Sequence, residues 1–305
     1  MSTRRMSRRR WWWLIGGAAG LAVIAAGLWF WQSTARQPTP EEAALGYLHA
    51  LESGDADAVA ATGITVSATA LDAFESATAL IEEAAVKTVR EHDDSADVGV
   101  VFRLDGEKHT ARLKLIPVDG RWSVDESGLG TLTAESTIGA DVSIGQATAP
   151  VNEEIALLPA TYSVAAAPSA LLSGESTVQM LPGAAATAAV VAELRPEATA
   201  TAQTQLDDHL ETCTAPGSEV PDGCGIRIPW GMEFGEVTEI GYRIDESPTI
   251  ALTPTGFTAE GGVLVATVTG TGLDGAARTV TYRTESWNLR GDASFTADGL
   301  LLSMW

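Results

Sequence analysis

The stretch VGVVFRLDGEKHTARLKLIPVDGRWSV, residues 98–124, decides the fold of the first part of this chain. Its apolar residues alternate with others, as at Val98, Val100 and Phe102, which is the period of a strand with one buried face. Two Asp-Gly dipeptides separate the alternating runs. Because Asp-Gly between such runs is a strong hairpin signal, the sequence predicts three antiparallel strands in a meander.

Helices are predicted immediately before this meander. Thr39, Pro40 and Glu42 form a capping box with proline at the first helical position. An apolar stripe with helical spacing follows, and Gly54 ends the helix. A second, short helix is predicted over residues 56–62.

A third helix is predicted over Leu71–Val89, so residues 40–127 are expected to form an α+β domain of helices followed by an antiparallel sheet. Two segments, AALGYLHALESGDADAVAA (43–61) and PVDGRWSVDES (117–127), resemble the NTF2-like (cystatin-like) superfamily. The resemblance implies that a long helix packs in the curve of a bent antiparallel sheet. The superfamily includes enzymes, pocket binders and scaffolds, so the fold does not name a function.

The rest of the chain is predicted to hold two further domains. Residues 128–196 contain short β-like runs separated by Gly and Pro, which indicates a small β domain. Residues 197–305 are predicted as an α+β domain, with a helix over 197–212 and then several strands, the first at Ile226–Trp230. The LDDHLETC end of this helix and the later cysteine resemble a C-terminal domain of actinobacterial single-pass membrane proteins.

The N-terminus is predicted to cross a membrane. Residues 11–31 have no charged side chain and carry tryptophans at both ends. At ~1.5 Å per residue the segment is about 31 Å long, which matches a hydrocarbon core of roughly 30 Å. Five arginines lie in the tail of residues 1–10, so the positive-inside rule places that tail in the cytoplasm.

We therefore expect a cell-membrane protein with a single transmembrane helix in the bilayer at 11–31, a tether at 32–39 and extracytoplasmic C-terminal domains. The alternative is a cleaved signal peptide, for which Ser33-Thr34-Ala35 offers small residues, although secretory apolar regions are shorter, about 7–15 residues. Within the span, Gly16 and Gly20 form a GxxxG motif that could support a homodimer. Glycine is also common in spanning helices generally.

The charge of the exported part limits the classes of partner. The chain has 19 basic and 40 acidic residues. Five basic residues lie in the N-terminal tail, so the remainder has a net charge of −26. Such a surface repels phosphate backbones, so nucleic acid is not an expected partner. The charge could attract cations or basic peptides, or it could simply maintain solubility.

Cys213 and Cys224 are predicted to form a disulfide, because both lie in the exported part and a turn-rich segment joins them. In the chain-entropy model such a bond contributes about 3 kcal/mol. A metal site is not expected, on the argument that no third or fourth Cys or His lies nearby. We therefore expect no metal and no cofactor.

Candidate catalytic residues are not apparent in the sequence. It has no nucleophile elbow, phosphate-binding loop or dinucleotide fingerprint. His49 on the first helix is either a pocket residue or a half-buried helix position. Asp93, Ser95 and Asp97 have the spacing of calcium-loop ligands, but Val98 occupies the position of the required Gly, so a solvated loop is expected.

The function predicted from these observations is that of a non-catalytic, membrane-anchored extracytoplasmic protein that binds another cell-envelope component, either protein or glycan. A small-ligand binder that uses the NTF2-like cavity is the first alternative. A hydrolase or isomerase in that cavity is the second. A cavity filled by apolar side chains would favour the first reading, and an open cavity with ionisable groups would favour the other two.

Overall fold

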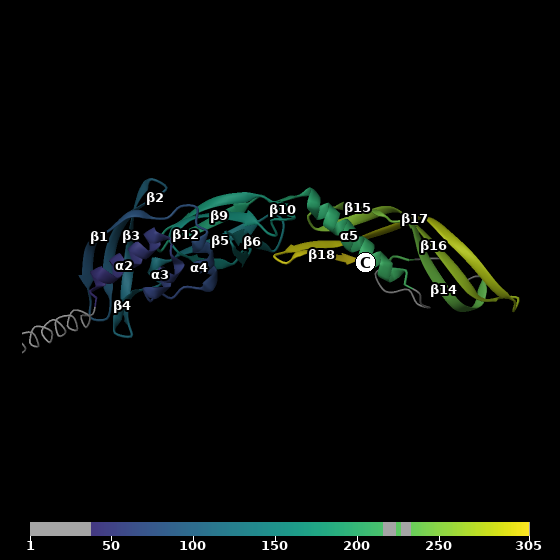
Figure 1. The fold of residues 1–305 in the computed structure, drawn as a ribbon, viewed down its shortest axis with the longest axis horizontal. Helices are drawn as coiled ribbons and strands as arrows, with labels where there is room; N and C mark the ends of the chain where they lie inside the picture. The colour runs from purple at the N-terminus through teal and green to yellow at the C-terminus, as the bar shows by residue number, and fades with distance from the viewer. Residues whose placement is uncertain (1–37, 216–223, 227–232, 305) are drawn as a thin grey trace, which may run out of the picture.

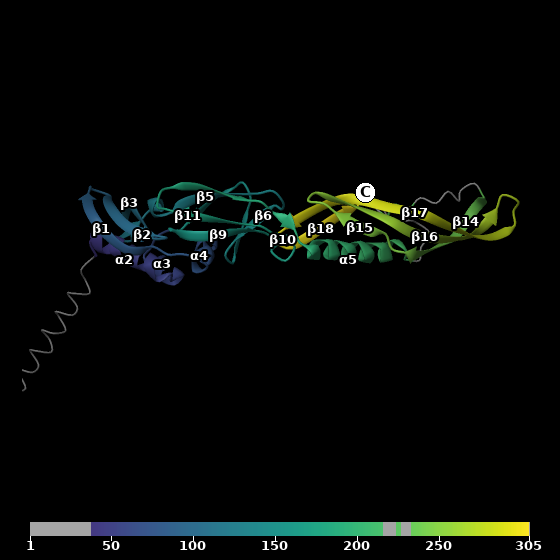
Figure 2. The same cartoon turned by 90° about the horizontal axis from the view of Figure 1, so that it is seen from above.

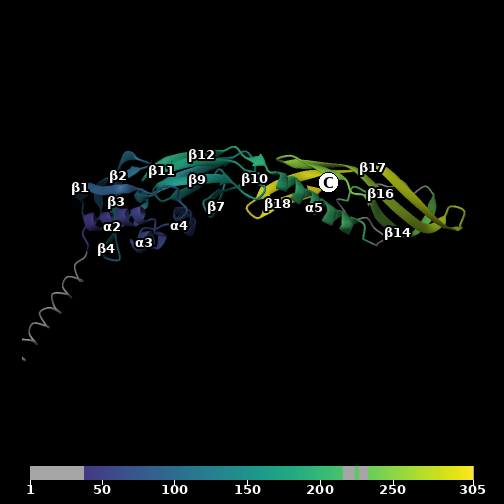
Figure 3. The ribbon, with the colours of Figure 1, turned by 45° about the horizontal axis from the view of Figure 1, so that its top comes forward.

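The computed structural model describes residues 38–215, 224–226 and 233–304. These residues form an elongated molecule in which three β-rich units follow one another along the long axis (Figure 1). Figures 2 and 3 show that the helices lie along one side of the molecule and the sheets along the other. The surface of the molecule therefore has a helix side and a sheet side.

The predicted cytoplasmic tail, the span at 11–31 and its Gly16 and Gly20 lie outside the described residues. Among the helices that the structure does describe, none is long and apolar enough to cross a membrane. The transmembrane helix, the homodimer and the topology therefore stay predictions.

The α+β fold class predicted for the chain is wrong, because the described residues are mostly β, with eighteen strands and four α-helices. The main local error is the helix predicted over Leu71–Val89. Helix α4, Ala68–Glu75, covers only its beginning, and strand β1, Glu82–Glu91, covers its end. Ala, Glu and Lys favour helix as single residues. The pairing of β1 with strand β2, Ala96–Leu104, outweighs that weak preference.

The predicted helix start is confirmed in α2, Pro40–Ser53. The Thr39 hydroxyl accepts a hydrogen bond from the Glu42 backbone N–H at 3.2 Å, and the Glu42 carboxylate accepts one from the Thr39 N–H at 2.8 Å. Gly54 ends the helix in the left-handed conformation, with φ 69°. Helix α3, Ala56–Ala61, follows where a short helix is predicted.

The predicted meander is also confirmed. Strand β2 pairs with β3, Glu107–Val118, and β3 pairs with β4, Arg121–Val124, in the sheet order β1-β2-β3-β4. Both residues of each Asp-Gly dipeptide have positive φ, between 50° and 79°. Positive φ at both central positions is the mark of a type I′ hairpin turn, which matches the twist of the strands that it joins.

Helix α2 packs across one face of this sheet. Apolar side chains fill the space between them. Fully buried side chains here are Tyr47, Leu48, Leu51, Val98, Phe102, Leu104, Leu113 and Leu115.

The second unit is a β-sandwich. One sheet has the order β11-β9-β6-β7 and the other β12-β5-β8, with a short β10–β13 pair beside them. Strand β12 runs parallel to β5, and every other pair in these sheets is antiparallel. The bounds are β5 (Gly130–Ser136), β6 (Asp141–Ile144), β7 (Ala147–Pro150), β8 (Glu154–Leu157), β9 (Ala160–Ala166), β10 (Leu172–Ser173), β11 (Glu175–Met180), β12 (Ala185–Val190) and β13 (Glu193–Leu194), after a 3-10 turn at Glu126–Gly128.

The third unit consists of helix α5 and a long antiparallel sheet in the order β14-β16-β17-β18, with β15 also paired to β16. The helix predicted over 197–212 is confirmed as α5. Of the strand predicted at Ile226–Trp230, only Ile226 is described, and it lies outside any strand. The bounds are α5 (Pro196–Cys213), β14 (Phe234–Glu246), β15 (Thr249–Leu252), β16 (Gly256–Gly272), β17 (Ala277–Thr296) and β18 (Gly299–Met304).

Hydrogen bonds join the units into one rod. At the first junction, the Asp105 carboxylate in the β2–β3 turn accepts from the Thr161 hydroxyl and, at 3.0 Å, from the Gln179 amide. At the second junction, the Ala140 N–H donates to the Phe295 carbonyl at 2.9 Å. A single buried apolar cluster runs through all three units, so the junctions are packed as well as hydrogen-bonded.

Candidate functional site: a basic face on the first sheet

The outer face of the first sheet gathers basic side chains. Residues directly opposite each other on paired strands point to the same side of a sheet. Aligned rows on the face turned away from the core hold five basic residues and two acidic ones. We call these rows the basic face: Arg90, Asp97 and Lys114; Thr88, Gly99 and Arg112; Val101 and Thr110; Glu82, Arg103 and Lys108.

An open hollow of about 300 Å³ lies in the middle of the basic face. Arg90 and Arg112 line it from β1 and β3, Thr88 and Thr110 add hydroxyl groups, and Asp97 adds one carboxylate. Gly99 forms part of its floor. A Cβ placed at Gly99 would meet the Thr88 hydroxyl oxygen, so the glycine leaves room for the threonine side chain in its present rotamer.

The two arginines at the hollow differ from those of the third unit in their pairing. In the described part of the chain, no carboxylate lies within ion-pairing distance of Arg90 or Arg112. In contrast, the Arg243 guanidinium lies 2.9 Å from the Asp245 carboxylate, and Arg278 has Glu233 and Asp274 within 4.0 Å. The hydrogen bond from Arg243, more than any other contact, holds the pKa of Asp245 below its usual range.

The helix side has the opposite charge. Helices α2, α3, α4 and α5 contain ten acidic residues and no lysine or arginine. Because α2 lies on the core face of the first sheet, the basic face points away from this acidic side. The protein is acidic as a whole, yet it presents one local surface suited to carboxylate or phosphate groups, which guanidinium groups recognise through paired hydrogen bonds.

The sequence predictions did not single out Arg90, Gly99 or Arg112. A signal was available in β3, where Lys108, Thr110, Arg112 and Lys114 recur at every second position, so that all four must share one face of a strand. The side chains that β1 adds to the basic face could not be predicted in the same way, because β1 is a strand where the sequence predicts a helix.

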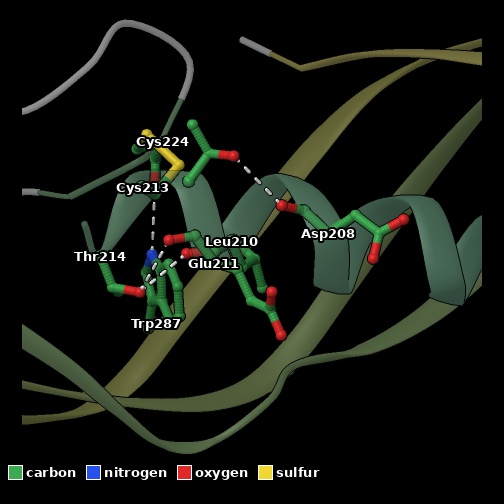
Figure 4. The surroundings of a disulfide bond; sticks show 8 residues. Asp208, Leu210, Glu211, Cys213, Thr214, Cys224 and Trp287 are labelled. Carbon is green, nitrogen blue, oxygen red and sulfur yellow. Dashed lines mark hydrogen bonds between the residues drawn. A yellow bond between two sulfur atoms is a disulfide. The ribbon is translucent and has the colours of Figure 1, made fainter.

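The predicted disulfide between Cys213 and Cys224 is confirmed. Their Cα atoms are 5.7 Å apart, and both residues are buried. The bond joins the end of α5 to the residue before Gly225 (Figure 4). The Trp287 indole N–H donates to the Cys224 carbonyl at 3.3 Å, which connects the disulfide to β17 and so to the long sheet.

The argument that no histidine lies near the cysteines is wrong. His209 precedes Cys213 by four residues on α5, which puts both on one face of the helix. One ring nitrogen of His209 and the sulfur atoms of Cys213 and Cys224 all lie within 4.8 Å of one another. The His209 Nε2 atom is buried and has no hydrogen-bond partner.

The other histidines offer less. His49 is exposed, so it is not a residue of an interior pocket. His92 lies 3.4 Å from the Asp97 carboxylate in the β1–β2 hairpin. The segment predicted as a solvated loop, residues 91–97, is that hairpin, and its tip is exposed. His109 stacks on Phe102 with ring centroids 5.8 Å apart.

Among its described residues, the first unit has a hollow of about 300 Å³ lined by Ser123, Asp125 and Glu126, whereas the space between α2 and the sheet is packed with apolar side chains. The one fully buried ionisable side chain described in this unit is Tyr47, whose hydroxyl donates to the Gly128 carbonyl at 2.8 Å. Burial, and secondarily the neighbouring Tyr162, raises the pKa of Tyr47 far above that of an exposed tyrosine, so the phenol stays neutral. This tyrosine holds the fold together and has no access to a substrate.

Comparison with known proteins adds no functional assignment. The chain matches no protein-family model, and no significant match is found among curated proteins or solved structures. The resemblance to the NTF2-like superfamily therefore stays a prediction.

Proposed function

We propose that this protein is a non-catalytic, membrane-anchored extracytoplasmic protein that uses its basic face to bind an anionic component of the cell envelope. The component is a protein or glycan that presents carboxylate or phosphate groups. The observation that carries the proposal is the hollow between Arg90 and Arg112, two arginines without an ion-pair partner among the described residues.

Charge distribution supports this reading. A chain with a net charge of −21 is repelled by anions at long range. Only a locally basic surface can hold them, at distances within the Debye length of about 8 Å at physiological salt. The elongated shape (Figure 1) and the acidic helices suit a protein that approaches an anionic polymer with one defined face.

The two alternative functions have less support. Both a small-ligand binder and a hydrolase or isomerase need an accessible cavity between α2 and the sheet. That space is filled by the buried side chains of Tyr47, Leu51, Phe102 and their neighbours. A second hollow, of about 560 Å³, lies between the first and second units, but Glu126 is its only ionisable lining residue.

The experiment is a binding assay with the purified full-length chain in detergent. An immobilised carboxylated glycan, polygalacturonate, is compared with neutral dextran. We expect binding to polygalacturonate alone, and we expect the double substitution Arg90→Gln and Arg112→Gln to weaken it roughly tenfold. That figure corresponds to about 0.7 kcal/mol for each of the two exposed charged contacts.

The matched control is the double substitution Arg243→Gln and Arg278→Gln, which removes the same charge from arginines that already have carboxylate neighbours. The control protein is expected to bind like the wild type. Equal losses in the two double variants would mean that only net charge matters, and the basic face would then have no special role.

A further inference from the structure

The end of α5 brings together three groups that bind soft and borderline metal ions. They are the imidazole of His209 and the sulfur atoms of Cys213 and Cys224, with one ligand atom from each residue within 4.8 Å of the other two. All three residues lie in the described part of the chain, and neither cysteine is exposed to solvent beyond 1%. Thiolate and imidazole are the usual ligands of Zn²⁺ in proteins.

The unpartnered nitrogen of His209 is the second observation. A buried polar atom without a hydrogen bond costs roughly 1–3 kcal/mol, and nearly all such atoms in folded proteins have a partner. His209 Nε2 is buried without a partner while the cysteines are joined. Coordination of a metal ion through Nε2, together with the two sulfurs, would satisfy it.

We propose that reduction of the Cys213–Cys224 disulfide converts this end of α5 into a Zn²⁺ site with His209, Cys213 and Cys224 as its three protein ligands. The disulfide form cannot bind the ion in this way, because its sulfur atoms are bonded to each other. The site is therefore controlled by redox state, and it is independent of the basic face.

The chemistry balances with a dithiol as the reductant. The dithiol supplies two electrons and two protons, becomes a disulfide itself, and leaves thiols at Cys213 and Cys224. Zn²⁺ then replaces the two thiol protons, which pass to solvent, while neutral His209 contributes a nitrogen lone pair. Water takes the fourth position of the tetrahedral ion.

The backbone geometry allows this change. With a Zn–S distance of about 2.3 Å and a Zn–N distance of about 2.0 Å, a nitrogen and a sulfur of one tetrahedral site lie roughly 3.6 Å apart. The nitrogen and the sulfurs already lie within 4.8 Å of one another, so their approach requires about 1 Å. The two sulfurs, which are bonded in the oxidised form, must also move apart to roughly 3.8 Å. Two of the three ligands, His209 and Cys213, are fixed one helical turn apart on α5.

Cobalt is the probe, because tetrahedral Co²⁺ bound to thiolates gives a charge-transfer band in the near ultraviolet and strong bands in the visible. Full-length protein in detergent is reduced with a dithiol, desalted without oxygen and titrated with Co²⁺, and Zn²⁺ is then added as a competitor. We expect one equivalent of Co²⁺ with both sets of bands, displacement by one equivalent of Zn²⁺, and no bands from the oxidised protein.

Variants separate the proposed site from simple capture of metal by two thiols. His209→Ala is expected to weaken Co²⁺ binding at least about tenfold, and His209→Asn, which keeps a polar group of similar size, should behave in the same way. His92→Ala is the control, because His92 is exposed in the first unit. Circular dichroism of each reduced variant shows whether its sheets stay folded.

Three results would overturn the proposal. One is the absence of thiolate bands from the reduced wild-type protein. Another is an affinity in folded His209→Ala or His209→Asn protein equal to that of the wild type. The third is an equal loss in the His92→Ala control, which would show that the histidine effect is not local.

Discussion

Tyr47 allows a sharp test of how the first unit is held together. It is fully buried on α2, and its hydroxyl donates to the Gly128 carbonyl at 2.8 Å, which ties the helix to the beginning of the second unit. Tyr47→Phe keeps the ring and removes the donor. The Gly128 carbonyl is then left buried without this partner, so the free energy of unfolding should fall by about 1–3 kcal/mol at neutral pH.

Alkaline pH should shrink this deficit. Burial raises the pKa of Tyr47 in the folded state, whereas an unfolded tyrosine ionises near pH 10. The unfolded wild type therefore releases a proton that the folded state retains. Its stability is complete below about pH 10 and falls by about 1.4 kcal/mol per pH unit above it for this one group. Tyr47→Phe lacks that loss, so the two proteins should converge.

Urea unfolding at pH 7, 10 and 11, followed by circular dichroism, measures both effects. Tyr162→Phe serves as a parallel case, because the Tyr162 hydroxyl donates to the Leu158 carbonyl at 2.7 Å and burial also raises its pKa. A Tyr47→Phe protein as stable as wild type at pH 7, or a deficit unchanged between pH 7 and pH 11, would refute this reasoning.

Three further outcomes are expected. Replacing Cys213 and Cys224 by serine should lower the stability of the third unit by about 3 kcal/mol. Calorimetry should then show an earlier transition for the third unit and an unchanged transition for the first. A melting profile identical to that of the wild type would contradict this. Gly99→Val should weaken polygalacturonate binding without any change in charge, because the new side chain fills the hollow beside Thr88. Wild-type affinity in a folded variant would show that the hollow is not needed for binding. A reporter that is active only in the cytoplasm, fused after Trp305, should be silent, and strong activity would reverse the predicted topology.

Local signals in the sequence predicted local structure well. The capping box at Thr39 and the Asp-Gly turns of the meander are confirmed, because each depends on residues within a few positions of one another. The Cys213–Cys224 disulfide is confirmed for a similar reason, since a short segment separates the two cysteines.

Features that depend on distant contacts were not predicted. Strand β1 has helix-forming residues and becomes a strand through its pairing with β2. Without β1, the sequence could not place Arg90 beside Arg112, and the basic face was missed. Likewise, the spacing of His209 and Cys213 is visible in the sequence, but the approach of Cys224 to both requires the folded chain.

The central claim is that the basic face contacts an anionic envelope component, and photo-crosslinking in living cells tests it most directly. A photoreactive residue replaces Thr110 on the basic face or, as the control, Thr279 on the exposed part of the third unit's sheet. Adducts are then identified by mass spectrometry. The account predicts an adduct with a carboxylate- or phosphate-bearing component at position 110 only, lost when Arg90→Gln and Arg112→Gln are introduced. Equal adducts at both positions, or an adduct at 110 that persists without the two arginines, would contradict it.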